Sequence, residues 1–366
     1  MPHNKGVMAL EFAPAVKRIP VYPAGAGYAR RGPLVRLESN ESPYPPLPEV
    51  VAAANAVLEG INRYPDPNSI VLREALSARY GVPVERIAVG NGSADILLAA
   101  GSALLEPGAE LIYGWPSFSV YPQVAGLSGA RAVVVPLDER EYLDLDAMAD
   151  AVTPATRLVI VCNPNNPTST ALELDRIAAF IERVPSRVCV MIDEAYCEFN
   201  TLNPPDASIA LLAVHKNLVL LRTFSKVHGL CGLRVGFALC ATTELPEALS
   251  VIRQPFFANA AAQAAATEAL AHPEEVARRV DSAHVARSEM RERLRSLGLS
   301  PAPSEANFCW FELGPLRDEA EIVRGIAEQG VLVRAGSALG KQGALRVTYG
   351  TREENSRFIE ALSALL

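Results

Sequence analysis

Three residues whose chemistry could work together are Asp193, Lys226 and Arg234, spaced thirty-three and eight positions apart. Asp193 follows the apolar run 187–192, and Lys226 lies just after a second apolar run at 218–222. If both runs are parallel strands, their carboxyl ends open into the crevice where α/β sheets bind ligands. A lysine in that crevice can form a Schiff base, and a buried aspartate can keep a pyridinium nitrogen protonated, which is how proteins tune pyridoxal phosphate (PLP).

The same pattern has two other interpretations. A lysine after a strand is often a solvated surface group, and an apolar run that ends in Asp-Glu also occurs in the magnesium-binding strand of P-loop ATPases. Such an ATPase requires the sequence G-x-x-x-x-G-K-[ST] upstream. The only Gly-Lys pair in the chain, Gly340-Lys341, is followed by Gln342 and lies far downstream. The sequence therefore excludes the ATPase.

A glycine-containing loop, Gly90-Asn91-Gly92-Ser93-Ala94-Asp95, is predicted between a strand and a helix. Its glycines permit close backbone approach, and the free N–H groups of a helix N-terminus suit a phosphate. Asp95 replaces the third glycine of a dinucleotide fingerprint, so that fingerprint is incomplete. A plain strand-to-helix turn explains the loop almost as well. Arg234 favours the phosphate interpretation, because a guanidinium offers a rigid fork of donors.

Two further segments have both a structural and a chemical interpretation. The segment Asn163-Pro164-Asn165-Asn166-Pro167-Thr168 is by itself a proline-rich turn. At the same sheet edge as Asp193, however, its amide could donate a hydrogen bond to a ring hydroxyl. Phe118 is either part of the core or a face on which a planar cofactor stacks.

The composition limits the classes of function. The chain has 366 residues and a net charge of -7, so it carries no basic footprint for nucleic acid. It contains no apolar run long enough to span a membrane and no signal-peptide h-region at its N-terminus. Its five histidines lack metal-ligand spacing, and its six cysteines include no C-x-x-C pair. We therefore expect a cytoplasmic protein with free thiols and with no metal, nucleic-acid or membrane partner.

The elements that must position these residues alternate along the chain. From about residue 47 to 245, helical patterns alternate with short β-branched runs, which predicts a mostly parallel α/β sheet covered on both faces. The strands are expected at 87–89, 110–113, 132–135, 158–162, 188–192, 218–221 and 235–239. A long charged helix is then expected at 273–297, followed by strands at 307–312, 331–334 and 345–348. This last part is typical of a smaller α+β domain.

These patterns predict that the chain has three parts, as follows. Residues 1–46 form a Pro/Gly-rich N-terminal arm that packs with the small domain, since an isolated extended arm buries too little surface to become ordered. Residues 47–250 form the large PLP-binding α/β domain. Residues 251–366 form the linking helix and the small C-terminal α+β domain.

The ordered motifs resemble those of PLP-dependent aminotransferases of fold type I, and most closely the branch of histidinol-phosphate and aromatic aminotransferases. The resemblance covers nearly the whole chain, through the segments Tyr22-Pro23-Ala24-Gly25, Ser39-Asn40-Glu41-Ser42-Pro43, Tyr64-Pro65-Asp66-Pro67, Gly90-Asn91-Gly92-Ser93, Asn165-Asn166-Pro167-Thr168, Asp193-Glu194-Ala195-Tyr196, Thr223-Phe224-Ser225-Lys226, Arg234 and Leu345-Arg346-Val347-Thr348-Tyr349-Gly350. Each segment alone is weakly specific, but their joint order and spacing are very specific. The resemblance implies a seven-stranded large domain, a smaller α+β domain and a homodimer with shared active sites.

The resemblance also implies a role for each matching residue. Lys226 would be the Schiff-base lysine and Asp193 the partner of the pyridine nitrogen, with Tyr196 as the third catalytic residue. The other cofactor contacts would be stacking by Phe118, hydrogen bonds to the ring O3′ from Asn166 and Tyr196, and phosphate contacts from Ser93, Ala94, Thr223, Ser225, Arg234 and, from the neighbouring subunit, Tyr64. The substrate would contact Tyr22, Asn40, Asn166, Arg334 and Arg346. Arg346 would hold a carboxylate in a bidentate fork.

Two positions depart from the family pattern. Ser169 stands where glycine is usual, and Ala94 stands where an acidic residue is usual. Neither change should abolish cofactor binding, because backbone or neighbouring atoms carry those contacts.

The reaction that the resemblance implies is transamination, with L-histidinol phosphate and 2-oxoglutarate as the expected substrates. An aromatic amino acid, phenylalanine or tyrosine, is the alternative amino donor, and an amino-acid-phosphate decarboxylase is a further alternative among PLP enzymes. Outside that group, a nucleotide-binding oxidoreductase and a non-catalytic binding protein are the rival classes. The sequence does not choose among the PLP reactions.

Overall fold

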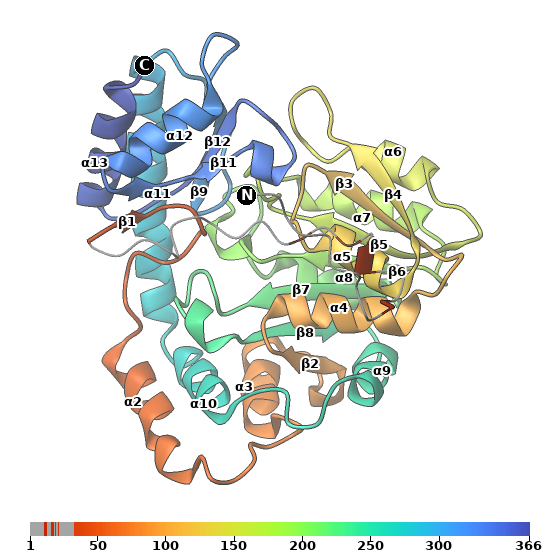
Figure 1. Cartoon of the computed structure of the whole chain (residues 1–366). Coiled ribbons are helices and arrows are strands. Elements are labelled where there is room, and N and C mark those ends of the chain that lie inside the picture. The colour runs from red at the N-terminus through yellow and green to blue at the C-terminus, as the bar shows by residue number, and fades with distance from the viewer. Residues whose placement is uncertain (1–10, 13–15, 18, 20, 22–32) are drawn as a thin grey trace.

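A seven-stranded sheet forms the centre of the large domain (Figure 1), and its strand order is β2-β8-β7-β6-β5-β3-β4. The computed structural model describes residues 33–366 without a gap and, before them, residues 11–12, 16–17, 19 and 21. Only β8 runs antiparallel to its neighbours, β2 and β7. All seven predicted strands are present, each within two residues of its predicted ends. The mostly parallel α/β sheet predicted from the sequence is confirmed.

The strands of this sheet are β2 (Ile87–Gly90), β3 (Glu110–Trp115), β4 (Arg131–Pro136), β5 (Thr156–Cys162), β6 (Cys189–Asp193), β7 (Leu218–Thr223) and β8 (Gly236–Cys240). The α-helices of the same domain are α2 (Pro48–Ala56), α3 (Ile70–Tyr80), α4 (Ser93–Leu104), α5 (Tyr121–Ser128), α6 (Leu145–Asp150), α7 (Leu174–Arg183), α8 (Leu211–Val214), α9 (Glu244–Ile252) and α10 (Ala260–Ala269). Its 3-10 helices are Leu58–Gly60, Val84–Arg86, Cys197–Phe199, Ala207–Ala210 and Cys231–Leu233.

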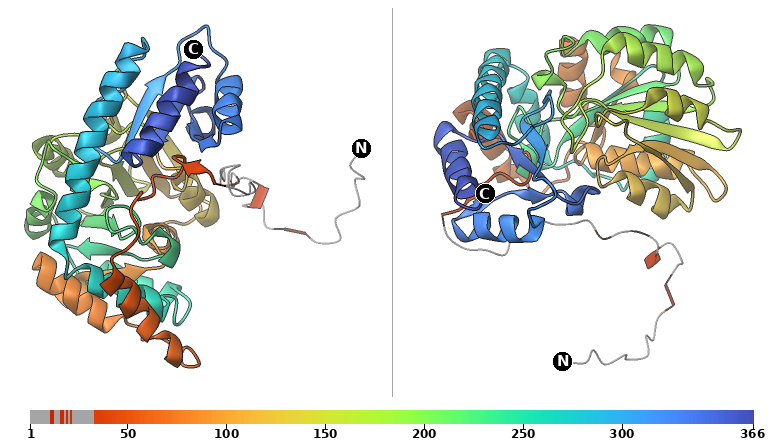
Figure 2. Two further views of the ribbon diagram at one scale, coloured as in Figure 1. Left: turned by 90° about the vertical axis from the view of Figure 1, so that its left-hand side faces the viewer. Right: turned by 90° about the horizontal axis from the view of Figure 1, so that it is seen from above.

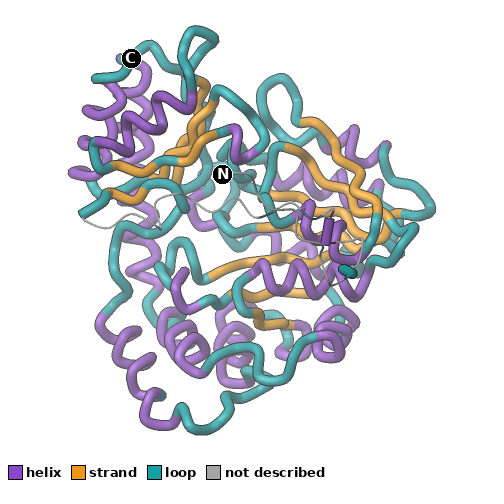
Figure 3. Tube along the Cα trace, viewed as in Figure 1, coloured by secondary structure: helices purple, strands orange, loops and turns teal. Residues whose placement is uncertain are grey.

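Helices cover both faces of this sheet (Figure 3), which is why its central strands read as continuous apolar runs. In β5, Leu158 and Ile160 pack toward the side of α4, α5 and α9, whereas Val159 and Val161 pack toward the side of α3, α7 and α10. The covering helices are amphipathic. In α7, for example, the side chains that face the sheet are Ile177, Phe180 and Ile181, at the spacing of one helix face.

The C-terminal part has a three-stranded antiparallel sheet with the order β11-β12-β9. Its elements are α11 (Pro273–Ser296), β9 (Phe308–Glu312), α12 (Glu319–Glu328), β10 (Val331–Leu332), β11 (Arg334–Ala335), the 3-10 helix Ser337–Leu339, β12 (Ala344–Thr348) and α13 (Arg352–Ser363). The long helix α11 runs from the large domain to this part (Figure 2). No helix in the described part of the chain is both long enough and apolar enough to cross a bilayer.

The N-terminal arm joins the C-terminal part through β1 (Val35–Arg36), which pairs in parallel with β10. Val35 and Leu37 pack into the same apolar cluster as α11, α12 and α13. The strand predicted at 331–334 is two short strands, because β10 pairs with the arm and β11 pairs with β12. The sequence predicted one strand here because Val331, Leu332 and Val333 form a continuous apolar run that leads directly into Arg334.

Candidate active site

A cavity of about 630 Å³ opens at the carboxyl ends of the parallel strands. β5, β6 and β7 end at its wall, as expected for an open α/β sheet. The arm and the small domain close the other sides. The lining residues are Glu38, Ser39, Asn40, Glu41, Ser93, Ala94, Phe118, Ser119, Val120, Cys162, Asn166, Asp193, Ala195, Tyr196, Thr223, Ser225, Lys226, Cys231, Gly232, Arg234, Arg334, Leu339 and Arg346.

This cavity brings together nearly all of the site residues predicted from the sequence. Among the described residues, the predicted site residue that does not line this cavity is Tyr64. Tyr64 is 80% exposed and stacks on Phe256 with 4.2 Å between the ring centroids. Tyr22 lies outside the described residues.

Asp193, the last residue of β6, presents its carboxylate to the cavity while only 3% of the residue is exposed. The Tyr121 hydroxyl donates to Oδ2 at 2.8 Å, and the Ala195 N–H donates to Oδ1 at 3.3 Å. Burial raises the pKa of Asp193 to about 6, and the two donors oppose that rise. Tyr121 was not among the residues predicted from the sequence, although it lies three residues after Phe118 and has a polar tip that needs a partner when buried.

Lys226 lies in the loop after β7, and its Nζ donates to the Ser39 carbonyl oxygen at 3.2 Å. The same amine lies 5.7 Å from the centre of the Tyr196 ring. Burial, followed by the positive charge of Arg346, lowers the pKa of Lys226 to about 8. A neutral amine is therefore accessible near neutral pH, and a neutral amine is what a nucleophile or a proton acceptor requires.

The loop before α4 fits tightly against Arg234. A Cβ added to Gly92, whose φ is +84°, would lie 2.5 Å from an Arg234 guanidinium nitrogen. A Cβ added to Gly236 would lie 2.5 Å from the Ser93 backbone nitrogen. Because no side chains intervene, the first N–H groups of α4 and the guanidinium can converge on one anion. The Thr223 and Ser225 side chains line the same cavity.

A chain of hydrogen bonds connects the arm, the large domain and the small domain around the cavity. Asn40 Nδ2 donates to the Tyr196 hydroxyl at 2.9 Å. The Arg346 guanidinium donates to Asn166 Oδ1 at 2.5 Å and to the Glu38 carbonyl oxygen at 2.6 Å. Burial raises the pKa of Tyr196 far above its ordinary value, so the hydroxyl stays protonated. Asn166 uses its oxygen for Arg346 and keeps its N–H₂ group as a donor.

Arg334 and Arg346 face each other across the antiparallel pair β11–β12. Both line the cavity, and they are only 7% and 6% exposed. Two like charges on opposed strand positions are unfavourable by themselves. This arrangement is therefore suited to anionic groups of a ligand.

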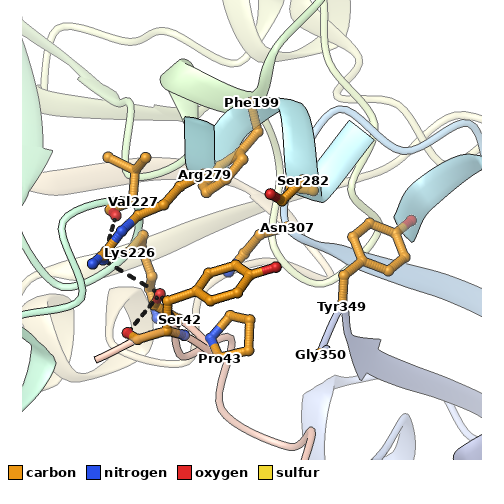
Figure 4. A pocket seen from close by; sticks show the side chains of 12 residues that line it. Ser42, Pro43, Phe199, Lys226, Val227, Arg279, Ser282, Asn307, Tyr349 and Gly350 are labelled. Carbon is orange, nitrogen blue, oxygen red and sulfur yellow. Dashed lines mark hydrogen bonds between the residues drawn. The ribbon is translucent and has the colours of Figure 1, made fainter. Parts of the chain in front are cut away.

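A second, small cavity of about 20 Å³ lies beside the Lys226 loop (Figure 4). Arg279 of α11 is buried in its wall and donates to the Val227 carbonyl oxygen at 3.0 Å and to Ser42 Oγ at 3.5 Å. The helix and the arm are thus attached to the residue next to Lys226. These contacts help to hold the lysine loop in place.

Comparison with known proteins identifies the family. Residues 33–362 match the family Aminotransferase class I and II. The chain belongs to this family. This aminotransferase is 39% identical over 356 residues to an aromatic amino acid aminotransferase of Cutibacterium acnes, covering 97% of the chain and 99% of the relative. It is 42% identical over 369 residues to histidinol-phosphate aminotransferase 2 of Ralstonia nicotianae, covering 98% of each.

Solved structures show the same fold. A histidinol-phosphate aminotransferase from Sinorhizobium meliloti, solved in complex with pyridoxal-5′-phosphate, superposes with a TM-score of 0.86 and 26% identity over 97% of each chain. The aminotransferase has the fold type I architecture, and its cofactor is pyridoxal phosphate. The cavity fits that cofactor, because it combines a buried carboxylate for a pyridinium, an amine of lowered pKa for a carbonyl, and a helix N-terminus with Arg234 for a phosphate.

Proposed function

We propose that this aminotransferase transfers the amino group of L-histidinol phosphate to 2-oxoglutarate in histidine biosynthesis. The products would be imidazole acetol phosphate and L-glutamate. The observation that carries the proposal is the pair of buried arginines, Arg334 and Arg346, that face one cavity from opposed strands. Several similar proteins bear this name.

The charges of the two substrates suit the two arginines. Histidinol phosphate has a phosphate and no carboxylate, whereas glutamate has an α-carboxylate. Asn166 and Glu38 already orient Arg346, so it would hold the carboxylate of glutamate in a fixed fork. Arg334 Nε has no hydrogen-bond partner among the described residues. We assign the phosphate to Arg334, and the resemblance to the family assigns Tyr22 to the same substrate group.

The roles of the remaining residues follow from their chemistry. Bound pyridoxal phosphate supplies a ring that accepts the electrons released when the bond to the substrate α-hydrogen breaks. Lys226 Nζ would take that proton and return it. Asp193 would hold the ring nitrogen protonated, Asn166 and Tyr196 would bind the ring oxygen, and Phe118 would stack on the ring. The phosphate would lie among Ser93, Ala94, Thr223, Ser225 and Arg234.

An aromatic amino acid is the second candidate substrate. Part of the cavity wall beside the cofactor residues is apolar, formed by Val120 and Leu339, and such a wall suits a phenyl ring. Other similar proteins are named aromatic amino acid aminotransferases. Phenylalanine or tyrosine would place its carboxylate on Arg346 and leave Arg334 unused.

We also propose a homodimer whose two sites share residues. Around Tyr64 the chain exposes large apolar side chains, including Leu58, Ile61 and Phe256, and such surfaces mark protein interfaces. A second copy that covers this surface would bring Tyr64 to the partner's phosphate site. The cytoplasm is the proposed compartment, since all six thiols are free and four of them are buried.

The substrate assignment predicts opposite effects of two substitutions. Arg334→Ala should lower kcat/KM for histidinol phosphate, because a charged hydrogen-bond partner of the phosphate is lost. The corresponding loss of transition-state stabilisation should be about 2–3 kcal/mol. The same change should lower kcat/KM for glutamate much less. Arg346→Ala should instead lower kcat/KM for glutamate strongly and kcat/KM for histidinol phosphate only slightly. Steady-state rates with histidinol phosphate, phenylalanine and glutamate measure both effects. If wild type prefers phenylalanine and Arg334→Ala is neutral for both donors, the aromatic assignment replaces this one.

A further inference from the structure

Tyr121 lies directly behind the candidate cofactor site. It is the first residue of α5, and its side chain has no exposed surface. Its ring packs at 5.7 Å from Phe118 and at 5.8 Å from Tyr113, between ring centroids. Its hydroxyl donates to Asp193 Oδ2 at 2.8 Å. Burial holds the pKa of Tyr121 well above its ordinary value, so this oxygen keeps its proton and acts as the donor.

Asp193 has few other polar neighbours. Cys162 on β5, Glu194 and Tyr196 on the segment after β6, and Lys226 after β7 are the titratable groups near it. Of these, Glu194 turns to Arg222 at 2.8 Å, and Cys162 Sγ donates to the Pro164 carbonyl oxygen at 3.5 Å. Within the described part of the chain, the donors to the Asp193 carboxylate are the Tyr121 hydroxyl and the Ala195 N–H.

We propose that Tyr121 is a positioning residue that keeps the Asp193 carboxylate anionic and correctly turned toward the ring nitrogen of the cofactor. The proposal rests on the role proposed above for Asp193. One proton is shared between the carboxylate and the ring nitrogen. A hydrogen bond from Tyr121 lowers the proton affinity of the carboxylate, so the proton stays on the nitrogen. Without that donor, the proton moves toward Asp193 and the ring accepts electrons less well.

The variant that isolates this contact is Tyr121→Phe, which removes one oxygen and keeps the ring. The matched control is Tyr113→Phe. Tyr113 is a buried tyrosine on β3 whose ring lies against Tyr121, and it is not one of the main causes of the pKa shift of Asp193. Asp193→Asn serves as the reference for complete loss of the carboxylate.

The first measurement uses the cofactor-free enzyme. The pKa of Asp193 is raised to about 6 in the folded protein, so the folded state holds this proton more tightly than the unfolded state does. Stability is therefore lost as pH rises toward 6 and stays lost above it. Tyr121→Phe raises this pKa further, so its deficit in unfolding free energy relative to wild type should be larger at pH 8 than at pH 5. A purely structural role of the hydroxyl would give the same deficit at both pH values.

The second measurement uses the enzyme loaded with ¹⁵N-labelled pyridoxal phosphate. In Tyr121→Phe the ¹⁵N chemical shift of the ring nitrogen should move toward the unprotonated value, and the single-turnover rate should fall roughly tenfold with KM little changed. Tyr113→Phe should match wild type in both. If Asp193→Asn is slow but Tyr121→Phe matches wild type in ¹⁵N shift and in the pH dependence of stability, the role of Tyr121 is refuted. If Asp193→Asn itself turns over at the wild-type rate, the role proposed for Asp193 is wrong instead.

Discussion

At the scale of single residues, the Lys226 amine differs from an ordinary lysine. Burial and the nearby charge of Arg346 lower its pKa to about 8, from an ordinary value of 10.5. A cation is costly in a buried place beside another cation. At neutral pH the folded protein therefore holds a larger fraction of this amine in the neutral form than an ordinary lysine would, and the neutral form is the one that reacts with an aldehyde.

This pKa predicts how the rate of covalent attachment of pyridoxal phosphate to the cofactor-free enzyme depends on pH. The rate should rise with pH and level off above about 8, because only the neutral amine attacks. Stopped-flow absorbance after mixing measures it. Arg346→Met removes the nearby cation and should move the midpoint to higher pH. A wild-type midpoint near 10.5 would show that the amine is not perturbed.

The chemistry of single residues could be predicted from the sequence, but their surroundings could not. Lys226, Asp193 and Arg346 belong to recognisable motifs, and all three line the cavity. The contact between Tyr121 and Asp193 joins residues 72 positions apart, so only the packing of α5 on the sheet creates it. Ser169 is a similar case. Its φ of +61° explains why glycine is usual at this position. The sequence shows that serine replaces glycine here, but it does not show the positive φ.

At the scale of elements, a buried ion pair connects the ends of β6 and β7. Arg222 Nε donates to Glu194 Oε2 at 2.8 Å, and the two side chains are 2% and 7% exposed. Arg222 also donates to Asp206 at 2.7 Å. Glu194 directly follows Asp193, and Arg222 directly precedes Thr223. The pair therefore holds two cavity-lining residues at a fixed separation.

Breaking this pair should be costly. Arg222→Met leaves the Glu194 carboxylate buried without its partner, and we expect a loss of about 3–5 kcal/mol in the free energy of unfolding. The matched control is Arg183→Met. Arg183 pairs with Asp146 and Asp150 but is 43% exposed, and its loss should cost at most about 1 kcal/mol. Urea unfolding of both variants measures the difference. Equal losses would mean that the Arg222 pair does not stabilise the strand ends.

The positions of the strands along the sequence were easier to predict than the pairing between strands. Seven runs of β-branched and other apolar residues marked the seven strands of the large sheet, because the central strands of a sheet covered on both faces are mostly apolar. The antiparallel direction of β8 and the division of 331–334 into β10 and β11 depend on which strand each one pairs with. Those partners lie far away in the sequence, so local patterns carry no information about them.

At the scale of the whole molecule, the shared-site homodimer predicts complementation between two defective variants. Tyr64→Phe would remove the proposed phosphate contact from the opposite site and should lower activity roughly tenfold. Lys226→Ala should abolish turnover. In a heterodimer of the two, one site would contain both Lys226 and Tyr64 and the other site neither. Mixing the two proteins under conditions of subunit exchange should therefore raise activity above that of Tyr64→Phe alone.

The controls for this experiment are each variant exchanged with itself. If the mixture is no more active than the Tyr64→Phe protein that it contains, Tyr64 does not act in the partner's site. Sedimentation of the wild-type enzyme as an active monomer would contradict the dimer altogether.

The arm and β12 can come into contact only late in the synthesis of the chain. Arg346 donates to the Glu38 carbonyl oxygen although 308 positions separate the two residues. At roughly 5–20 residues per second, a ribosome needs about 15–60 s to synthesise the segment between them. For most of that interval the arm has no β10 to pair with, and throughout it Lys226 has no complete pocket around it. Cofactor capture should therefore follow chain release rather than accompany synthesis, and a nascent chain stalled before β12 should remain unable to retain pyridoxal phosphate.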